Sequence, residues 1–166
     1  MNTKRFAKIA MTAAVYTVVS LALAPFSFGP VQVRISEALT LLPLIWHDAV
    51  YALILGCFLT NLLGVAFSVT GPIDILVGTL ATGLAAIATY RLRDRKIHGA
   101  PVLSILMPVI FNGFLVGLEL AWMLNPTEIM MVFPIYALEV AAGELVSVIA
   151  GWFLIKQLAK TELFIE

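Results

Sequence analysis

Five long apolar runs constrain what this chain can fold into. They cover about residues 6–24, 49–69, 72–90, 101–123 and 130–155. The hydrocarbon layer of a bilayer is about 30 Å thick and needs roughly 20 apolar helical residues to cross it, so each run is long enough to be a membrane span. A mean hydropathy of +1.03 and a charged fraction of 12% also fall outside the range of soluble globular proteins. The sequence therefore predicts an all-α integral membrane protein.

Turn-forming and charged residues separate these runs. The breaks fall at Pro25, at Gly71-Pro72, at the charged run from Arg91 to Lys96, and at Asn125-Pro126, where a chain is expected to leave a helix. The connections are short, and the chain has no internal repeat or linker. Residues 1–166 are therefore predicted to form one compact membrane domain.

A sixth apolar segment, Ile35 to Trp46, has only 12 residues, and its length does not decide whether it crosses the membrane. Charge does, because nine basic residues fall into three groups at or beyond the ends of the long runs: Lys4, Arg5 and Lys8; Arg91, Arg93, Arg95 and Lys96; Lys156 and Lys160. Under the positive-inside rule all three groups are cytoplasmic, which requires an even number of crossings. We therefore expect a bundle of six transmembrane helices with both termini cytoplasmic, and Arg34 as the one basic residue on the outer side.

The N-terminus has an alternative interpretation. Basic residues, an apolar run and the segment Ala22-Leu23-Ala24 resemble a cleavable signal peptide. The run is at or beyond the usual length for such a peptide, and Pro25 would directly follow the cut. We therefore expect the first run to remain as a span.

Four ionisable side chains lie within the long runs: Asp74, Glu119, Glu139 and Glu144. Each costs about 2.5 to 3.5 kcal/mol on insertion scales unless it is paired or faces a cavity, so each is a candidate functional group. Asp74 has a simpler interpretation as the acid at a helix N-terminus. Glu144 lies about 140° around the helix from Glu139. It is predicted to be a deep hydrogen-bonding group between helices rather than part of the same pocket wall.

The last two runs each combine a carboxylate with an aromatic ring. Glu119 and Trp122 are three residues apart, as are Tyr136 and Glu139, so each pair shares a helix face. Asn112 lies seven residues before Glu119, on the same side. These residues predict an outward-facing ligand pocket, although Trp122 can also be an ordinary interfacial aromatic. Because the runs contain no lysine or arginine beside these carboxylates, Arg34 or a cationic ligand is the expected counter-charge.

Sequence motifs for other kinds of chemistry are missing. There is no Gly-x-x-x-x-Gly-Lys phosphate loop, no His-Glu-x-x-His and no Gly-x-Ser-x-Gly. The single cysteine, Cys57, gives no disulfide and no metal-ligand spacing. Ten basic and ten acidic residues cancel without a basic block, which argues against nucleic acid as a partner. We expect no enzyme, no cofactor and no metal, but a binding or transport unit in the lipid bilayer.

One spacing in the first run points to a protein partner. Ala10 and Ala14 form a small-x-x-x-small pair, which lets helix backbones approach closely in lipid.

Three segments carry a resemblance to a known family. They are FGPVQVRISEALTLLPL from Phe28 to Leu44, GCFLTNLLG from Gly56 to Gly64, and GPIDILVGTLAT from Gly71 to Thr82. Together they resemble the QueT family of substrate-specific S components of energy-coupling factor (ECF) transporters, and the similarity runs over nearly the whole chain. The resemblance implies a bacterial plasma-membrane protein that takes up a queuosine precursor, 7-aminomethyl-7-deazaguanine.

The resemblance also implies a partner and a set of ligand contacts. The partner is an ECF module of one transmembrane coupling protein and two cytoplasmic ATPases, with the Ala10 and Ala14 face docking on the coupling protein. We expect the amine of the deazapurine to pair with one carboxylate and its guanine-like edge to donate to a second carboxylate. Its carbonyl is expected to accept from Arg34 or Asn112, and its ring to stack on an aromatic side chain. The expected substrate-binding residues are Arg34, Glu37, Asn112, Glu119, Trp122, Tyr136 and Glu139. 

Two other functions stay open at this point. The chain can be a self-sufficient secondary transporter for a small cationic or nucleobase-like solute, or a non-transporting structural subunit of the membrane.

Overall fold

Helices make up nearly all of the described chain. A computed structural model describes residues 3–27, 34–161 and 164. The five long helices are α1 (Thr3–Ala22), α3 (Ala49–Ala66), α4 (Asp74–Leu92), α5 (Val102–Leu124) and α6 (Ile129–Leu158), and the two short ones are α2 (Ala24–Ser27) and the 3₁₀ helix η1 (Ile35–Leu44). Over the described ranges there is no strand, only an isolated bridge between Ile97 and Ala100. The all-α prediction is confirmed.

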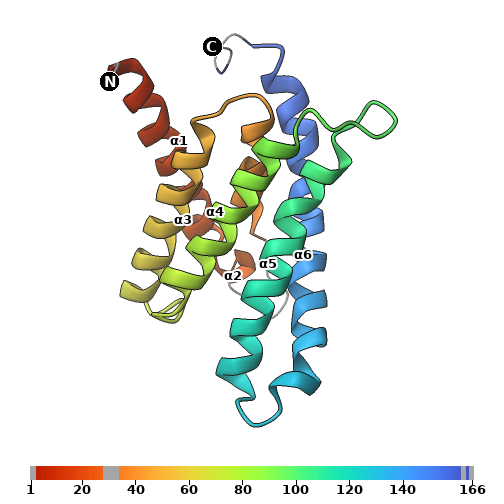
Figure 1. Cartoon of the computed structure of the whole chain (residues 1–166). Coiled ribbons are helices and arrows are strands. Elements are labelled where there is room, and N and C mark those ends of the chain that lie inside the picture. The colour runs from red at the N-terminus through yellow and green to blue at the C-terminus, as the bar shows by residue number, and fades with distance from the viewer. Residues whose placement is uncertain (1–2, 28–33, 162–163, 165–166) are drawn as a thin grey trace.

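The five long helices match the predicted runs to within a few residues. Each is long and apolar enough to cross a membrane. The helices run alternately in opposite directions, so both termini, the turn after η1 and the α4–α5 loop lie at one end of the molecule (Figure 1). The α3–α4 and α5–α6 loops lie at the other end. All nine basic residues outside Arg34 therefore belong to helix ends and loops at the terminal end, as the charge pattern predicts.

The segment predicted as a sixth span has a different helix type. It forms a 3₁₀ helix of ten residues with Pro43 inside it. Proline lacks the N–H that both helix types use at an interior position, so Pro43 removes one backbone hydrogen bond from η1. At about 2 Å per residue, ten residues of 3₁₀ helix rise about 20 Å, less than the hydrocarbon thickness. A complete sixth crossing stays a prediction, because residues 28–33 lie outside the described chain.

The 3₁₀ helix η1 is the central element of the bundle. It contacts α1, α3, α4, α5 and α6. Its packing on α6 is backbone to backbone, since a Cβ atom on Gly151 would lie 2.4 Å from the carbonyl oxygen of Ala38. The C-terminal half of η1 belongs to an apolar core formed by Leu41, Leu42, Trp46, Ala49, Ala52, Val148 and Ile155. This core fills the half of the bundle nearer the termini, so the polar start of η1 points toward the other half.

Candidate ligand-binding site

Arg34 and Glu37 lie at the start of η1, inside the bundle. Their exposed fractions are 7% and 0%. One turn of 3₁₀ helix places the two side chains on the same face, and the Nη1 atom of Arg34 lies 3.8 Å from Oε1 of Glu37. Arg34, predicted from the charge pattern to lie on the outer side, therefore lies in the protein interior. Gln32, which precedes them, lies outside the described residues.

One oxygen of Glu37 is held by side chains from two other helices. Tyr16 of α1 donates its hydroxyl to Oε1 of Glu37, and Thr82 of α4 donates to the same oxygen over 3.2 Å. The Sγ atom of Cys57 lies beside this group and accepts from Thr82 over 3.4 Å. The second oxygen, Oε2, has no hydrogen-bond partner among the described residues. The carboxyl group is thus fixed in place with one oxygen available for another donor.

Glu119 of α5 and Glu144 of α6 are two further buried carboxyl groups, each 5% exposed. Both oxygens of Glu119 and Oε2 of Glu144 lack a hydrogen-bond partner in the described part of the chain. Glu144 interacts electrostatically with Glu37 and Arg34. Glu119 interacts with Asp74 and Arg34. Three carboxyl groups from three helices therefore lie within electrostatic range of one guanidinium group.

Two asparagines add amide groups to this interior. Asn112 of α5 is 3% exposed, and its Nδ2 donor has no partner within the described ranges. Asn61 of α3 donates from Nδ2 to the backbone oxygen of Asp74 over 2.8 Å. The carboxylate of Asp74 accepts from the backbone N–H of Gly71 over 2.9 Å. These contacts support the interpretation of Asp74 as the acid that fixes the start of α4.

Three of the four residues in the two predicted carboxylate–aromatic pairs lie nearer the surface than Glu119 does. Glu119 and Trp122 line the same groove between α4 and α5, which has a volume of about 230 Å³. Trp122 is 52% exposed. Tyr136 and Glu139 of α6 are half-buried, and the Tyr136 hydroxyl accepts a hydrogen bond of 2.9 Å from Asn125. The structure thus brings Arg34, Glu37 and Glu119 together, with Asn112 buried on the bundle side of α5, and places Trp122, Tyr136 and Glu139 toward the periphery.

Glu144 is the group that sequence reasoning placed outside the pocket wall. The residues of α6 that face the bundle are Val140, Gly143, Glu144, Ser147, Val148, Gly151 and Ile155, and Glu139 does not belong to them. The angle of about 140° between the two glutamates correctly separates their faces. The small residues Gly143, Ser147 and Gly151 mark the side of closest helix packing, and this signal was available in the sequence.

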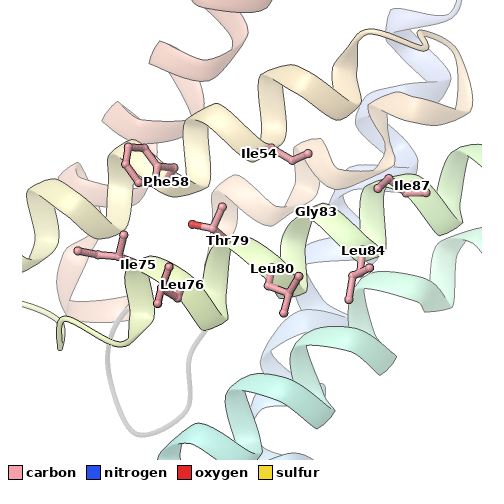
Figure 2. Close-up of a pocket in the computed structure, with 9 residues that line it drawn as sticks. All are labelled: Ile54, Phe58, Ile75, Leu76, Thr79, Leu80, Gly83, Leu84 and Ile87. Atoms are coloured by element: carbon pink, nitrogen blue, oxygen red, sulfur yellow. The ribbon is translucent and has the colours of Figure 1, made fainter.

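A separate pocket lies away from the polar cluster. It lies between α3 and α4, has a volume of about 440 Å³, and is lined by Ile54, Phe58, Ile75, Leu76, Thr79, Leu80, Gly83, Leu84 and Ile87. Figure 2 shows that the Thr79 oxygen is the only polar side-chain atom among them. Leu76 is 74% exposed and Leu80 is 55% exposed. Such an apolar lateral groove suits contact with lipid and offers a polar ligand only the Thr79 hydroxyl, so we place the candidate site at the buried polar cluster.

An arginine and three carboxyl groups lie inside this bundle of apolar helices, and this combination indicates which class of protein the chain belongs to. Ionisable groups at such positions mark substrate or ion sites in membrane proteins, so the chain is a multi-pass membrane protein of the transporter class. It belongs to the QueT transporter family, whose sequence model matches residues 6–160. The family resemblance read from the sequence is confirmed.

One curated relative shows how far this similarity extends. The queuosine precursor transporter QueT of Lactococcus lactis subsp. cremoris is 32% identical over 76 residues, which are 45% of this chain and 42% of the relative. The aligned part therefore spans less than half the length of that relative. No solved structure matches the chain.

Proposed function

We propose that this chain binds 7-aminomethyl-7-deazaguanine, a queuosine precursor, and serves as the substrate-binding component of an ECF transporter in the bacterial plasma membrane. Membership of the QueT transporter family supports a transport role, and the name of the Lactococcus relative supports a queuosine precursor as the substrate. The observation that carries the binding role is the buried cluster of Arg34, Glu37, Glu119 and Glu144, in which Oε2 of Glu37, both oxygens of Glu119 and Oε2 of Glu144 lack hydrogen-bond partners among the described residues.

Charge in the cluster favours a cationic ligand. One arginine stands against three buried carboxyl groups, and a primary alkyl amine is protonated at pH 7, as lysine is. A buried polar atom without a partner costs about 1–3 kcal/mol. A ligand that brings one ammonium group and several N–H donors therefore gains these interactions on binding.

The positions of the carboxyl groups suggest which part of the ligand each of them contacts. Glu119 and Asp74 interact with each other near the outer groove, and two neighbouring acids favour a cation between them. We assign the ammonium group to this pair. Glu37 and Glu144 then accept from the guanine-like N–H edge, and Asn112 or Arg34 donates to the ring carbonyl.

The peripheral residues fit an entry route. Trp122 shares the groove with Glu119, and its ring offers a stacking face for the base. Tyr136 supplies a second ring, and Glu139 supplies a further carboxylate for an approaching cation.

The orientation follows from the basic residues. The termini and the α4–α5 loop lie together at one end (Figure 1), and the positive-inside rule assigns that end to the cytoplasm. The polar cluster lies in the other half, so the site opens outward. In this arrangement η1 serves as the short sixth crossing, and both termini are cytoplasmic.

Energy must come from a partner under this proposal, because the sequence has no phosphate loop. Ala10 and Ala14 are exposed on α1, where small side chains permit close helix contact. We infer that this face docks on the coupling protein of an ECF module, whose two ATPases supply the energy.

Uptake into proteoliposomes tests this assignment. We expect labelled 7-aminomethyl-7-deazaguanine to enter only when the chain is reconstituted with the coupling protein, both ATPases and ATP. Uptake by the chain alone under an ion gradient would make it a self-sufficient secondary transporter. Failure to bind any deazapurine would instead favour a structural subunit.

A further inference from the structure

A second polar pocket lies at the terminal end of the bundle, far along the helices from Glu37. It is formed by the α4–α5 loop, the end of η1 and the last turns of α6, and it has a volume of about 230 Å³. Arg93, Lys96 and Lys156 line it together with apolar residues that include Ile45 and Trp152. No acidic side chain is among its described lining residues. The pocket thus combines three cations with an apolar wall.

Two of these cations are positioned by aromatic rings. The guanidinium carbon of Arg93 lies 3.8 Å from the centre of the Tyr90 ring, and the ammonium nitrogen of Lys156 lies 4.6 Å from the centre of the Trp152 ring. A cation over a ring face keeps N–H donors for an anion.

The other contacts of Arg93 leave its positive charge largely available. Its Nη1 donates to the backbone oxygen of Tyr90 over 3.3 Å, and its Nε lies 3.8 Å from the carboxylate of Asp94, which is 86% exposed. Exposed ion pairs of this kind contribute little free energy to stability.

Helix dipoles and membrane topology explain why some basic residues lie at this end of the bundle, but not why three of them line one pocket. Lys156 lies in the last turn of α6, and Arg93 is the C-cap of α4, where cations are favoured. The positive-inside rule likewise favours basic residues at this end. The positive-inside rule applies equally to Arg95 and Lys160, and the helix dipole applies to Arg91 in the last turn of α4. None of these three residues lines the pocket.

We propose that this pocket binds the phosphate group of an anionic phospholipid. Arginine and lysine donors suit a phosphate, and tryptophan is typical of the headgroup level of a bilayer. Basic pockets between transmembrane helices on the cytoplasmic side bind anionic head groups. The apolar wall formed by Ile45 and Trp152 favours a lipid over free phosphate, because a lipid can cover it with its glycerol and first acyl carbons.

Native mass spectrometry of the purified full chain tests the site. The chain is titrated in detergent with phosphatidylglycerol or with phosphatidylcholine carrying the same acyl chains, and separately with inorganic phosphate alone. We expect one phosphatidylglycerol per chain, held about tenfold more tightly than phosphatidylcholine. The triple variant Arg93→Gln/Lys96→Gln/Lys156→Gln should lose about this tenfold preference.

A charge-matched control separates the pocket from the general surface. The variant Arg91→Gln/Arg95→Gln/Lys160→Gln removes three positive charges at the same end, but none of these residues lines the pocket. Its affinity for phosphatidylglycerol should change by less than about twofold. Circular dichroism checks the fold of both triple variants. If the pocket variant does not fold, the single variants Lys96→Gln and Lys156→Gln, at exposed side chains, should each lose part of the preference.

Three results would overturn the proposal. Equal losses in the two triple variants would mean diffuse surface charge, and equal binding of the two lipids would mean that no headgroup site exists. If inorganic phosphate displaces phosphatidylglycerol at equal concentration, the pocket is a site for a soluble anion. None of these readouts depends on deazapurine binding or transport.

Discussion

At the scale of single residues, Glu37 shows how a charged group is kept inside an apolar bundle. One oxygen is held by Tyr16 and Thr82, and the other has no partner among the described residues. A carboxyl group held in this way is already positioned for a ligand, so less ordering is needed when the ligand binds. Both oxygens of Glu119 and Oε2 of Glu144 also lack hydrogen-bond partners among the described residues, so they too are available to a ligand.

Neutral substitutions test these carboxyl groups individually. We expect Glu119→Gln and Glu144→Gln each to weaken 7-aminomethyl-7-deazaguanine binding by at least about tenfold, or about 1.4 kcal/mol. The substitution keeps the side-chain size but removes the charge that faces the ammonium group or the N–H edge. Isothermal titration calorimetry measures the change.

Two further glutamates complete this series. Glu128 is exposed at the start of α6, so Glu128→Gln should leave the affinity unchanged. Glu139→Gln tests the sequence-based assignment, since a loss as large as at Glu119 would place Glu139 in the site. Unchanged affinity in both Glu119→Gln and Glu144→Gln would remove the pocket that we propose.

At the scale of elements, the position of η1 depends on close backbone contacts. A Cβ atom at Gly151 would lie 2.4 Å from the Ala38 carbonyl oxygen, so Gly151→Ala must push η1 away from α6. We expect a loss of about 1–3 kcal/mol in stability and weaker ligand binding, because Glu37 moves with η1.

The matched control for this change is Gly83→Ala in α4. There the new Cβ atom meets only the side chain of Ile54, at 3.2 Å, and a side chain can shift more easily than backbone. Thermal unfolding of both variants in detergent gives the comparison. Equal stability of Gly151→Ala and the unmodified protein would contradict the packing of η1 on α6.

The outer face of α1 makes a different prediction. Ala10→Leu/Ala14→Leu should leave deazapurine binding intact but abolish uptake by the complete transporter, because bulky side chains prevent close helix contact. Ala142 is exposed on α6, and Ala142→Leu serves as the control with normal uptake. Full transport by the double variant would place the docking face elsewhere.

An ion pair joins α1 to the turn before α3. Arg5 donates to both carboxylate oxygens of Asp48, and these hydrogen bonds hold the pKa of Asp48 below its ordinary value. A lowered pKa in the folded state gives stability that is complete above the unfolded value of about 3.9. This contribution is lost as the pH falls through the lower, folded-state pKa.

The pH dependence of unfolding tests this ion pair. Asp48→Asn should lower the unfolding temperature at pH 7, and its difference from the unmodified protein should shrink below about pH 4. Asp94 is 86% exposed, so Asp94→Asn should show almost no difference at either pH. A difference for Asp48→Asn that stays constant from pH 7 to pH 3 would contradict the role of the ion pair.

At the scale of the whole molecule, the bilayer makes some features predictable. The five long spans could be predicted from the sequence because the membrane fixes the length of an apolar helix and excludes charged loops. The end at which the basic residues gather could be predicted for the same reason. Arg34 stood out because it did not fit that pattern, and the structure places it at the centre of the polar cluster.

Other features could not be predicted, since both faces of a membrane helix are apolar. On α6, lipid-facing Leu138 and bundle-facing Val148 look alike in sequence, so periodicity does not show which glutamate points inward. The 3₁₀ helix η1 contacts five other helices, and a ten-residue apolar segment reveals neither this helix type nor these contacts.

The central claim is that the buried cluster recognises a deazapurine by its charge. The most direct test is calorimetric titration of the purified chain with 7-aminomethyl-7-deazaguanine and with 7-methyl-7-deazaguanine, which lacks only the amine. We expect saturable binding of one molecule of the first compound per chain, and affinity for the second that is lower by at least about tenfold. Equal affinity for the two compounds, or no binding of either, would contradict the account.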